Sequence, residues 1–580
     1  MADRIERRPE GPLPPAVGND LHPVLKRVYA RRGLASAREL DLSLGQLASP
    51  EGMADLDCAG ACLAEALRAG ERIVVVGDYD ADGATATALM VRALRLLATA
   101  VEGAPEAISF LVPDRFELGY GLSPEVVERL QPSAPDWLVT VDNGVTSAEG
   151  VAAAHACGMQ VVITDHHTPG EELPPAAAVV DPMRADDGFA TRTLAGVGVA
   201  FYTALAVRRA LQERGPLAGA GGSCPNLAGL LDLVAIGTVA DLVPLDHNNR
   251  ILVEQGLRRI RAGAGAPGIT ALIEAGGRDA TRATAADLAF AVGPRLNAAG
   301  RMDDMTAGVE CLLAEDHVTA RAKAEELDRL NRQRREVEAQ MTGEALAHLE
   351  AQAEEVGLGV CVAAEGWHQG VTGIVASRLK DRYKRPAVAF APADEGWLRG
   401  SARSVPGLHM RDLLAALHRD SPGLVERFGG HAMAAGLTIA RNQLDAFREA
   451  FAAALESALG GLPPQQRIET DGELAEEELT LETAVALRYG GPWGCGFPEP
   501  RFDGLFRIRE SRALRGGHLR LLLTPTGRAS PVWPAIAFGG VEHGWDWLEG
   551  RVRAVYTPEV NHYRGQASLQ LRIEHLTAAE

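Results

Sequence analysis

Four short apolar segments, each followed at once by acidic residues, constrain the fold of this chain more than any other feature of its sequence. They are RIVVVG (72–77), DWLVTV (136–141), MQVVIT (159–164) and AAAVV (176–180). Segments that are apolar throughout are typical of parallel strands that helices cover on both faces. The stretches between them are Ala-rich with a helical pattern. We therefore expect a lobe of the α/β class with a parallel sheet.

The polar residues that follow the four segments share one position in the expected sheet. In chain order they are Asp78, Asp80 and Asp82, then Asp142, then Asp165, His166 and His167, and finally Asp181. Ligands of open α/β sheets bind beyond the carboxyl ends of the strands, so we expect these side chains to converge. Because several carboxylates cannot stay ionised side by side without cations, the pattern predicts a metal site.

The types of ligand favour two hard divalent cations. Carboxylate oxygens with one or two imidazoles suit Mn²⁺ or Mg²⁺ better than zinc, although the choice of ion stays open. Two such ions roughly 3.5 to 4 Å apart would activate a water and stabilise the leaving oxygen in an in-line attack on phosphorus. The predicted chemistry is therefore hydrolysis of a phosphodiester bond.

Each of these residues also has a plainer interpretation. An acidic DxDxD is often a calcium loop or a solvated turn, but here the segment follows a buried strand and the later Glu of an EF-hand is missing. His166 and His167 could form a solvated turn or a helix cap. The last candidate ligand is Asp241 in LLDLVAIGTVADLVPLD, which could also be an ordinary helix-terminal Asp. Asp232 and Asp246 are weaker competitors in the same stretch.

Composition and charge narrow the class of protein. The length of 580 residues suggests three or four domains, and the formal net charge of −19 argues against a broad basic surface, so any contact with nucleic acid must be local. The chain has no signal-type segment and no long apolar run, and its seven cysteines form no CxxC pair, so we expect a cytoplasmic protein with reduced thiols. Cys58 and Cys62 have the spacing of helical neighbours. The sequence also lacks a Walker A loop, an HExxH motif and a GxSxG motif.

The rest of the chain divides into further segments. Residues 1–55 read as a partly ordered N-terminal arm, 316–355 as one long connecting helix, 356–460 as a second α/β lobe and 460–467 as a linker. Beyond the linker, five β-type runs within about a hundred residues predict a small barrel of the OB-fold type over 466–580.

Several motifs resemble those of one family, the DHH phosphoesterases. The matching segments are GDYDADGATA (77–86), VTVDNGVTS (139–147), TDHHTPG (164–170) and DLVAIGTVADLVPL (232–245). Four further segments resemble the RecJ-type members, namely VPDRFELGYGL, GPRLNAAGRMD, RGSARSVPGLHM and FGGHAMAAG, and the likeness spans roughly 60–575. The resemblance implies a DHH catalytic domain at 56–315, a DHHA1 domain at 356–460 and an OB-fold domain at 466–580.

The same resemblance implies roles for individual residues. It implies that the metal ligands are Asp80, Asp82, Asp142, His166 and Asp241. In this scheme Asp142 bridges both ions, while Asp78, Asp165 and His167 support the ligands or contact the scissile phosphate. Some members carry a histidine where Val76 stands, and Asp78 is a candidate to compensate for it.

Residues that would hold the substrate are implied in the same way. They are Arg115, Arg295, Arg301, Ser401, Arg403 and His431. For each arginine a surface ion pair remains the alternative. In the barrel, four aromatic residues could stack on unpaired bases or simply fill the interior, namely Trp533, Phe538, Tyr556 and Tyr563. The basic run Arg332, Arg334 and Arg335 on the long helix could face DNA, but a solvated face is the favoured interpretation.

Together these features predict a metal-dependent exonuclease that degrades single-stranded DNA in the 5′ to 3′ direction, in DNA repair and recombination. The expected partners are single-stranded DNA with a 5′ end and a helicase or single-strand-binding protein that supplies it, with no membrane. Two alternatives stay open. One is a phosphoesterase of very short oligonucleotides, against which the extra barrel counts, and the other is a non-catalytic replication scaffold, against which the intact acidic residues count.

Overall fold

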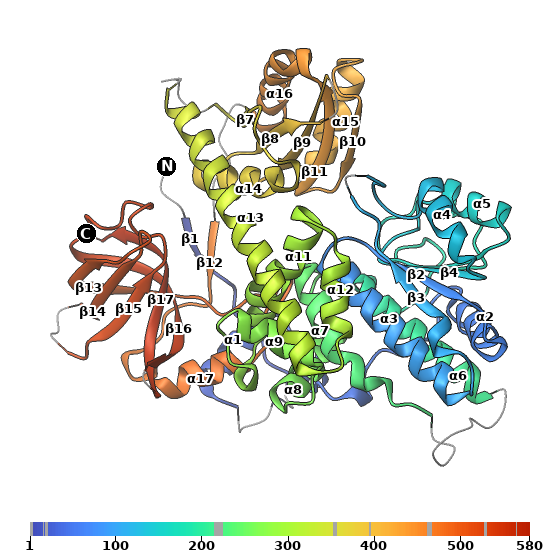
Figure 1. The fold of residues 1–580 in the computed structure, drawn as a ribbon. Coiled ribbons are helices and arrows are strands. Elements are labelled where there is room, and N and C mark those ends of the chain that lie inside the picture. The colour runs from blue at the N-terminus through green and yellow to red at the C-terminus, as the bar shows by residue number, and fades with distance from the viewer. Residues whose placement is uncertain are drawn as a thin grey trace. The chain divides into compact units, whose positions relative to one another are not determined.

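The fold is that of a computed structural model (Figure 1), which describes residues 4–14, 17, 21–115, 117–213, 224–351, 357–393, 396–460, 467–526, 530–563 and 565–579. The chain forms two compact units. The larger unit contains Ile5–Gly300, Asp304–Asp328 and Glu469–Glu580, and the smaller one contains mainly Arg329–Ile468, with Arg301–Asp303. Each unit is described by itself below.

The larger unit contains most of the helices and three groups of strands. Its helices are α1 (Pro23–Ala30), α2 (Leu56–Ala69), α3 (Ala81–Ala100), α4 (Pro124–Leu130), α5 (Ala148–Ala156), α6 (Gly196–Glu213), α7 (Leu231–Ala240), α8 (His247–Arg261), α9 (Pro267–Ala275), α10 (Ala285–Asp287), α12 (Thr306–Leu313) and α17 (Leu481–Tyr489). Helices α11 (Gly293–Met302) and α13 (His317–Ala351) contribute to both units.

A parallel five-stranded sheet forms the centre of the first lobe. Its order is β3 (Ile108–Leu111), β2 (Ile73–Val76), β4 (Trp137–Val141), β5 (Gln160–Thr164) and β6 (Ala178–Val180). Helices α2, α3 and α6 pack on one face, and α4 and α5 cover the other with a core of branched aliphatic side chains. Chain connections reverse direction between β2 and β4, which is where open sheets of this kind bind their ligands.

The four predicted strands of this lobe are confirmed, with ends shifted by one or two residues. Strand β3 escaped prediction because two of its four residues are only half-buried and a third is exposed, so the segment lacks the fully apolar pattern of its neighbours. It occupies the sheet edge, where burial on both faces is not needed. The predicted α/β class is correct.

The smaller unit contains a second, mixed sheet. Its order is β10 (Arg427–Gly430), β11 (Ala434–Ala440), β9 (Trp397–Arg403), β8 (Ala387–Pro392) and β7 (Val360–Ala363), of which only β7 and β8 run parallel. One face packs on α14 (Thr372–Tyr383) and the second half of α13. The other face packs on α15 (Met410–Asp420) and α16 (Leu444–Leu459). The predicted second α/β lobe is therefore present, and α13 is the predicted long helix.

The basic run on α13 differs from its prediction as a solvated face. Arg334 is almost fully buried and its guanidinium donates to Glu338 at 2.8 Å, while Arg378 donates to the other oxygen of Glu338 at 2.7 Å. The side chain is drawn inward because Glu338 lies one turn further along the same face. Arg332 and Arg335 are exposed as predicted.

The C-terminal segment closes into a five-stranded barrel. Its strands are β13 (Phe502–Ala513), β14 (Leu519–Pro525), β15 (Trp533–Ala537), β17 (Gln566–Ala578) and β16 (Gly550–Tyr563), in that order around the barrel. Trp533 and Tyr556 are buried inside it, so two of the four aromatic residues fill the interior, whereas Phe538 and Tyr563 are exposed. The predicted OB-type barrel is confirmed.

Arginines attach the N-terminal arm to the segment that leads into the barrel. Strand β1 (Arg4–Arg7) pairs with β12 (Arg467–Thr470). The buried carboxylate of Asp471 accepts hydrogen bonds from both Arg8 and Arg32, and Arg27 pairs with Glu478. The predicted arm thus includes a docked strand and helix, because its arginines meet buried or half-buried acids.

Candidate metal centre

The acidic residues of the first lobe lie where the strand order reverses. Asp78, Asp80 and Asp82 follow β2, Asp142 follows β4, and His166 follows β5. Strands β2 and β4 are direct neighbours, in register from Ile73 opposite Trp137. The parallel sheet thus brings together side chains that are far apart in the chain.

His166 lies at the centre of the cluster. Its Nε2 atom is 3.0 Å from Oδ1 of Asp142, 3.7 Å from Oδ2 of Asp241 and 3.9 Å from Oδ2 of Asp82. Donors that share one ion at about 2.1 Å lie about 3 to 4 Å from one another. The spacing is therefore that of ligands around a small divalent cation.

Three groups of side chains each bring three ligand atoms within 4.8 Å of one another. They are Asp82, His166 and Asp241; Asp142, His166 and His167; and Asp78, Asp80 and Asp142. Asp142 belongs to two of these groups. Asp78 lies close to Asp80 and Asp142. This is where a residue that compensates for the missing histidine at position 76 would need to lie. Asp181 belongs to none of the three groups.

Helix N-termini fix the first acidic motif. Asp80 caps α3 and accepts hydrogen bonds from the backbone N–H groups of Asp82 and Gly83, both at 2.9 Å. The carboxylate of Asp82 in turn accepts from Gly196 and Val197 at 2.7 and 3.0 Å, at the start of α6. Peptide N–H groups at a helix start favour a negative charge. Both carboxylates are therefore held in place before any ion binds.

Glycine is required at the start of α6 because Asp142 lies against it. A Cβ atom at position 196 would lie 2.5 Å from both Cβ and Oδ1 of Asp142. Asp142 itself adopts the left-handed conformation, with φ 62°. A non-glycine residue in that conformation stores strain that the surrounding structure must hold. The position of this carboxylate is thus determined by contacts on several sides.

Asp165 and His167 lie in hydrogen-bond contact beside His166. Asp165 Oδ1 lies 2.7 Å from Nδ1 of His167 and also accepts from the backbone N–H of His166, while its Oδ2 accepts from Val145 N–H at 2.9 Å. Burial raises the pKa of the Asp165 carboxyl, but the hydrogen bond and charge of His167, the N–H of Val145 and the charge of His166 together outweigh burial, and the pKa is lowered. For His167, burial lowers the pKa, yet Asp165 brings it to about 9. Asp165 therefore stays ionised and orients the histidine pair.

The remaining carboxyls repel one another. Burial raises the pKa of Asp82 to about 7, with Asp80 adding to the shift, and burial raises that of Asp241 to about 8, with Asp82 adding to it. The pKa values of Asp78 and Asp142 rise well above their usual range, through burial first and then neighbouring carboxylates. Ionising all of them at neutral pH requires a compensating positive charge.

The donor set fits divalent cations. Oδ1 of Asp142 is buried and accepts no hydrogen bond from the described part of the chain, although a carboxylate oxygen in that position normally has a donor. It faces Nε2 of His166, which is an ordinary metal-binding atom. Carboxylate oxygens with one imidazole suit Mg²⁺ or Mn²⁺. Asp80, Asp82, Asp142, His166 and Asp241 would hold the ions.

Of the three acids in the stretch 232–246, only Asp241 reaches the cluster. Both oxygens of Asp232 accept backbone N–H groups, at Leu233 and Ala266, which fixes the turn before α9. Asp246 caps α8 and also accepts from Thr193. The geometry thus selects Asp241 from the alternatives that the sequence left open.

Two asparagines at the site were missed in the sequence. The amide of Asn143 donates to the carbonyls of Val76 and Val141, which joins the ends of β2 and β4. Asn297 Oδ1 accepts from Ala81 N–H at 2.9 Å, at the start of α3. Both lie inside motifs quoted above, Asn143 directly after Asp142 and Asn297 between Leu296 and Ala298. Their neutral amides gave no signal of their own.

Arg115 and Arg295 lie in the same unit as the metal cluster but have different surroundings. The guanidinium of Arg115 lies 4.6 Å from the ring centre of Tyr79, and Tyr79 contacts Tyr120 edge-on. Arg295 is almost fully buried, donates to two backbone carbonyls and pairs with Asp328 at 2.6 Å. These contacts favour a structural role for Arg295, and its binding of DNA stays a prediction.

The other four predicted substrate residues lie in the smaller unit. Ser401 and Arg403 are on β9, and the hydroxyl of Ser401 is 3.0 Å from that of Thr372 at the start of α14. Arg301 donates to the carbonyl of Gly370, and His431 begins the turn between β10 and β11. Burial lowers the pKa of Arg403, and among the residues that the structure describes no carboxylate pairs with it. A half-buried guanidinium without an acid is a candidate anion site.

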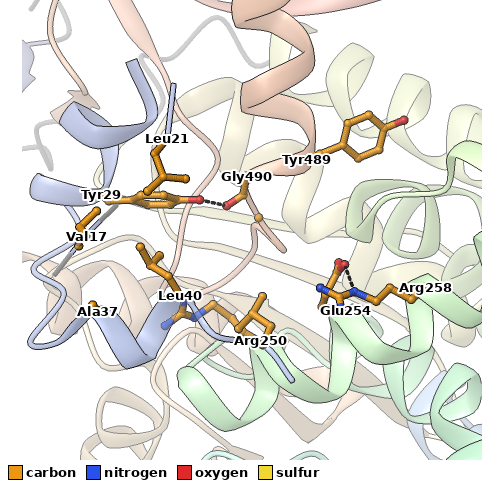
Figure 2. A pocket seen from close by; sticks show the side chains of 12 residues that line it. Val17, Leu21, Tyr29, Ala37, Leu40, Arg250, Glu254, Arg258, Tyr489 and Gly490 are labelled. Atoms are coloured by element: carbon orange, nitrogen blue, oxygen red, sulfur yellow. Dashed lines mark hydrogen bonds and ion pairs between the residues drawn. The ribbon is translucent and has the colours of Figure 1, made fainter. Parts of the chain in front are cut away.

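A cavity of about 380 Å³ lies elsewhere, between the N-terminal arm, α8 and the end of α17 (Figure 2). Its wall includes Tyr29, whose hydroxyl donates to the carbonyl of Gly490 at 2.6 Å, and Glu254, which accepts from Arg258. The Arg250 side chain also lines it and lies 4.2 Å from the ring centre of Phe497. None of the residues predicted to act in catalysis lines this cavity.

Family models match three parts of the chain. The DHH family, N-terminal domain, matches residues 72–238, the DHHA1 domain matches 357–457, and the RecJ OB domain matches 470–575. The exact domain boundaries predicted above stay predictions. Within the described residues no helix is both long and apolar enough to cross a membrane.

Several known proteins are similar over most or all of their length. The single-stranded-DNA-specific exonuclease RecJ of Dickeya dadantii is 50% identical over 99% of both chains, and that of Escherichia coli is 47% identical over 96% of both. The crystal structure of RecJ from Thermus thermophilus in complex with Mn²⁺ has a TM-score of 0.81 and 30% identity, covering all of this chain and 80% of that one. A second structure of that protein, in complex with Mg²⁺, has a TM-score of 0.70. With these likenesses over nearly its whole length, the chain belongs to the RecJ family of single-stranded-DNA-specific exonucleases.

Proposed function

We propose that this chain is a hydrolase that removes nucleotides from single-stranded DNA in the 5′ to 3′ direction, in DNA repair and recombination, with two Mn²⁺ or Mg²⁺ ions as cofactors. The observation that carries the proposal is the convergence of Asp82, Asp142, His166 and Asp241 at one sheet edge. The names of the relatives and the metals in the related structures support it. Delivery of the strand by a helicase or a single-strand-binding protein stays a prediction.

Individual residues of the chain would have distinct roles in hydrolysis of the phosphodiester bond. Bound divalent cations supply the positive charge that stabilises the attacking and leaving oxygens at phosphorus. Asp142 would hold the shared position, because it belongs to two of the ligand groups. Asp165 would keep His167 in one orientation through the 2.7 Å contact. His167, held in this way, would contact the scissile phosphate or support the neighbouring ligands.

Recognition of the 5′ end is proposed for residues on β9. A Cβ atom at Gly373 would lie 2.6 Å from a terminal nitrogen of Arg403, so glycine leaves the guanidinium room in front of α14. A guanidinium fork next to the N–H groups at a helix start is well suited to a phosphate. Ser401, with Thr372, adds two hydroxyls at the same place. These groups would bind the terminal phosphate of the strand.

Polarity is tested with DNA labelled at either terminus. Single-stranded DNA carrying the label at its 5′ or 3′ end is incubated with Mn²⁺, with Mg²⁺ or with EDTA. We expect immediate release of a labelled mononucleotide from the 5′-labelled strand with either metal, and none in EDTA. Release of mononucleotides only from the 3′ end, or internal cleavage of duplex DNA, would contradict the proposal.

The metal site is tested with Asp142→Asn, which keeps the shape and removes the charge. Loss of a carboxylate that belongs to two of the ligand groups should lower turnover at least about a hundredfold, more than loss of a supporting residue does. Asp136→Asn is the matched control, because Asp136 lies at the opposite end of the same strand and is 45% exposed. Calorimetric titration with Mn²⁺ should show weaker binding in Asp142→Asn alone. Equal activity and equal binding in the two variants would refute the site.

A further inference from the structure

The cavity beside the N-terminal arm has a charged wall and an apolar wall (Figure 2). Helix α8 supplies the charged wall, with Arg250, Glu254 and Arg258, which lie four residues apart and therefore share one face of the helix. The arm supplies the apolar wall, which includes Leu21, Tyr29, Leu40 and Leu42. The end of α17 closes the cavity between them. A ligand in this cavity would thus meet both kinds of surface.

Arg250 is buried in the charged wall without enough hydrogen-bond acceptors. Its side chain is 4% exposed, and its Nε atom has no hydrogen-bond partner in the described chain. The carboxylate of Glu39 lies 3.6 Å from a terminal nitrogen of Arg250, beyond ordinary hydrogen-bond distance. The ring of Phe497, 4.2 Å away, attracts the charge without replacing an acceptor. Burial lowers the pKa of Arg250, because these neighbours do not fully compensate the buried charge.

Other buried arginines of the same unit have a carboxylate at hydrogen-bond distance. Arg32, Arg184 and Arg295 each have an N–O distance below 3 Å to an aspartate. A buried guanidinium with unsatisfied N–H groups costs folding free energy, which such pairs avoid. Arg250 departs from this pattern, and it also borders a cavity. A bound anion could therefore supply the acceptor that the chain does not.

The acidic residue of the charged wall is already neutralised. Glu254 accepts a hydrogen bond from Nε of Arg258 at 2.8 Å, and a terminal nitrogen of Arg261 lies 3.4 Å from the same carboxylate. The guanidinium groups of Arg261 and Arg488 also lie 5.4 and 5.8 Å from the ring centre of Tyr489, at the end of α17. An anion that enters the cavity would therefore meet net positive charge.

The size of the cavity and its apolar wall define the kind of anion. A volume of about 380 Å³ is near the lower end of the range for small-molecule sites, about 300 to 1,000 Å³, and is too small for a folded segment or a polymer. Leu21, Leu40 and Leu42 are only half-buried, so a flat or apolar group that covers them would bury apolar surface. The guanidinium fork of Arg250 matches one phosphate or carboxylate group. The cavity thus fits one anionic group carried on a ring.

We propose that this cavity binds a nucleoside 5′-monophosphate, with the phosphate on the guanidinium of Arg250 and the base against the three leucines. The choice of ligand rests on the function proposed above, because a nuclease of that kind releases such a molecule at each turnover. None of the proposed metal ligands lines the cavity, so this site is separate from the one where the product forms. The arm, α8 and the end of α17 all border the cavity, so a bound nucleotide would join these three parts of the larger unit.

Equilibrium dialysis of the full chain against deoxyadenosine 5′-monophosphate in EDTA tests the site. The parent protein for this test carries Arg403→Gln, so that the proposed 5′-phosphate site does not contribute, and EDTA removes metal-dependent binding of phosphate. We expect one nucleotide bound per chain. Arg250→Gln should weaken binding at least about tenfold, because a charged partner of the phosphate is lost. Ala37→Phe, which fills the cavity and leaves Arg250 in place, should weaken binding as well and covers the case that Arg250→Gln weakens the fold.

The matched control is Arg259→Gln, which removes the same charge from the same helix. Arg259 donates to the carbonyl of Ala264 and does not line the cavity, so this variant should bind the nucleotide as the parent does. Inorganic phosphate and deoxyadenosine, each alone, should bind more weakly than the nucleotide.

Four outcomes would overturn the proposal. They are no binding at about 1 mM nucleotide, unchanged affinity in both cavity variants, an equal loss in Arg259→Gln, and inorganic phosphate that binds as tightly as the nucleotide. Because neither DNA nor metal is present, failure of the nuclease proposal would show separately, in the end-label assay.

Discussion

In the absence of metal, the free energy of unfolding of the first lobe should fall as pH rises. Asp82 and Asp241 have ordinary pKa values of 3.8 that burial raises to about 7 and about 8 in the folded protein, with neighbouring carboxylates adding to both shifts. A carboxyl whose pKa is raised by folding stabilises the fold only while protonated. Its contribution is complete below the unfolded pKa and is lost as pH rises through the folded pKa. The sensitive window is therefore from about pH 4 to about pH 8.

The size of the effect follows from the shift of Asp82. At about 1.4 kcal/mol for each pH unit below the folded pKa, raising the pH from about 5 to about 7 costs about 3 kcal/mol. For a lobe of this size, 1 kcal/mol changes the melting temperature by about 2 to 4 °C, so we expect a fall of about 6 to 12 °C. Melting of the full chain in EDTA at a series of pH values measures it. Excess Mn²⁺ should restore the melting temperature most strongly at the upper end of the series.

Asp241→Asn provides the control for this prediction. Its side chain is 27% exposed, and replacing the carboxylate by an amide removes one titrating group without changing the shape. The variant should show a shallower dependence of melting temperature on pH in EDTA. Asp136→Asn should retain the full dependence. A melting temperature that stays constant between about pH 5 and pH 8 in EDTA would show that ionisation of the clustered carboxyls does not destabilise the fold.

Further predictions concern three other positions. Gly196→Ala should lower turnover by more than about tenfold in a steady-state assay, because the new Cβ displaces Asp142. Gly198→Ala is the control: its new Cβ would lie 3.2 Å from the nearest atom, so its turnover should stay near that of the unmodified protein. Asp471→Asn should cost about 3 kcal/mol or more, seen as a lower melting temperature with unchanged Mn²⁺ binding, since two buried arginines lose their acid. Arg403→Gln should slow cleavage of 5′-phosphorylated DNA more than that of DNA with a 5′ hydroxyl, and an equal effect on both would remove Arg403 from the 5′ site.

Much of the candidate site could be predicted because its signal is local. Each of β2, β4 and β5 is an apolar run followed directly by ionisable residues, and the carboxyl ends of parallel strands lie at one edge. Periodicity likewise predicted α13 and the barrel strands. Strand β3 was missed because an edge strand does not need the fully buried pattern. Asn143 was missed because a neutral amide has no signature in the sequence.

The sequence by itself determined which ionisable side chains are available and that they follow strands. Both can be recognised locally, because each apolar strand segment and the ionisable residues after it are adjacent in the chain. Only the tertiary structure decided which of these groups meet. It selected Asp241 over Asp232, whose oxygens are taken by backbone N–H groups, and it turned Arg295 inward to Asp328 while leaving Arg403 without an acid among the described residues. The physical reason is that the interactions of a charged side chain depend on the groups within a few ångströms of it, and those groups come from distant parts of the chain.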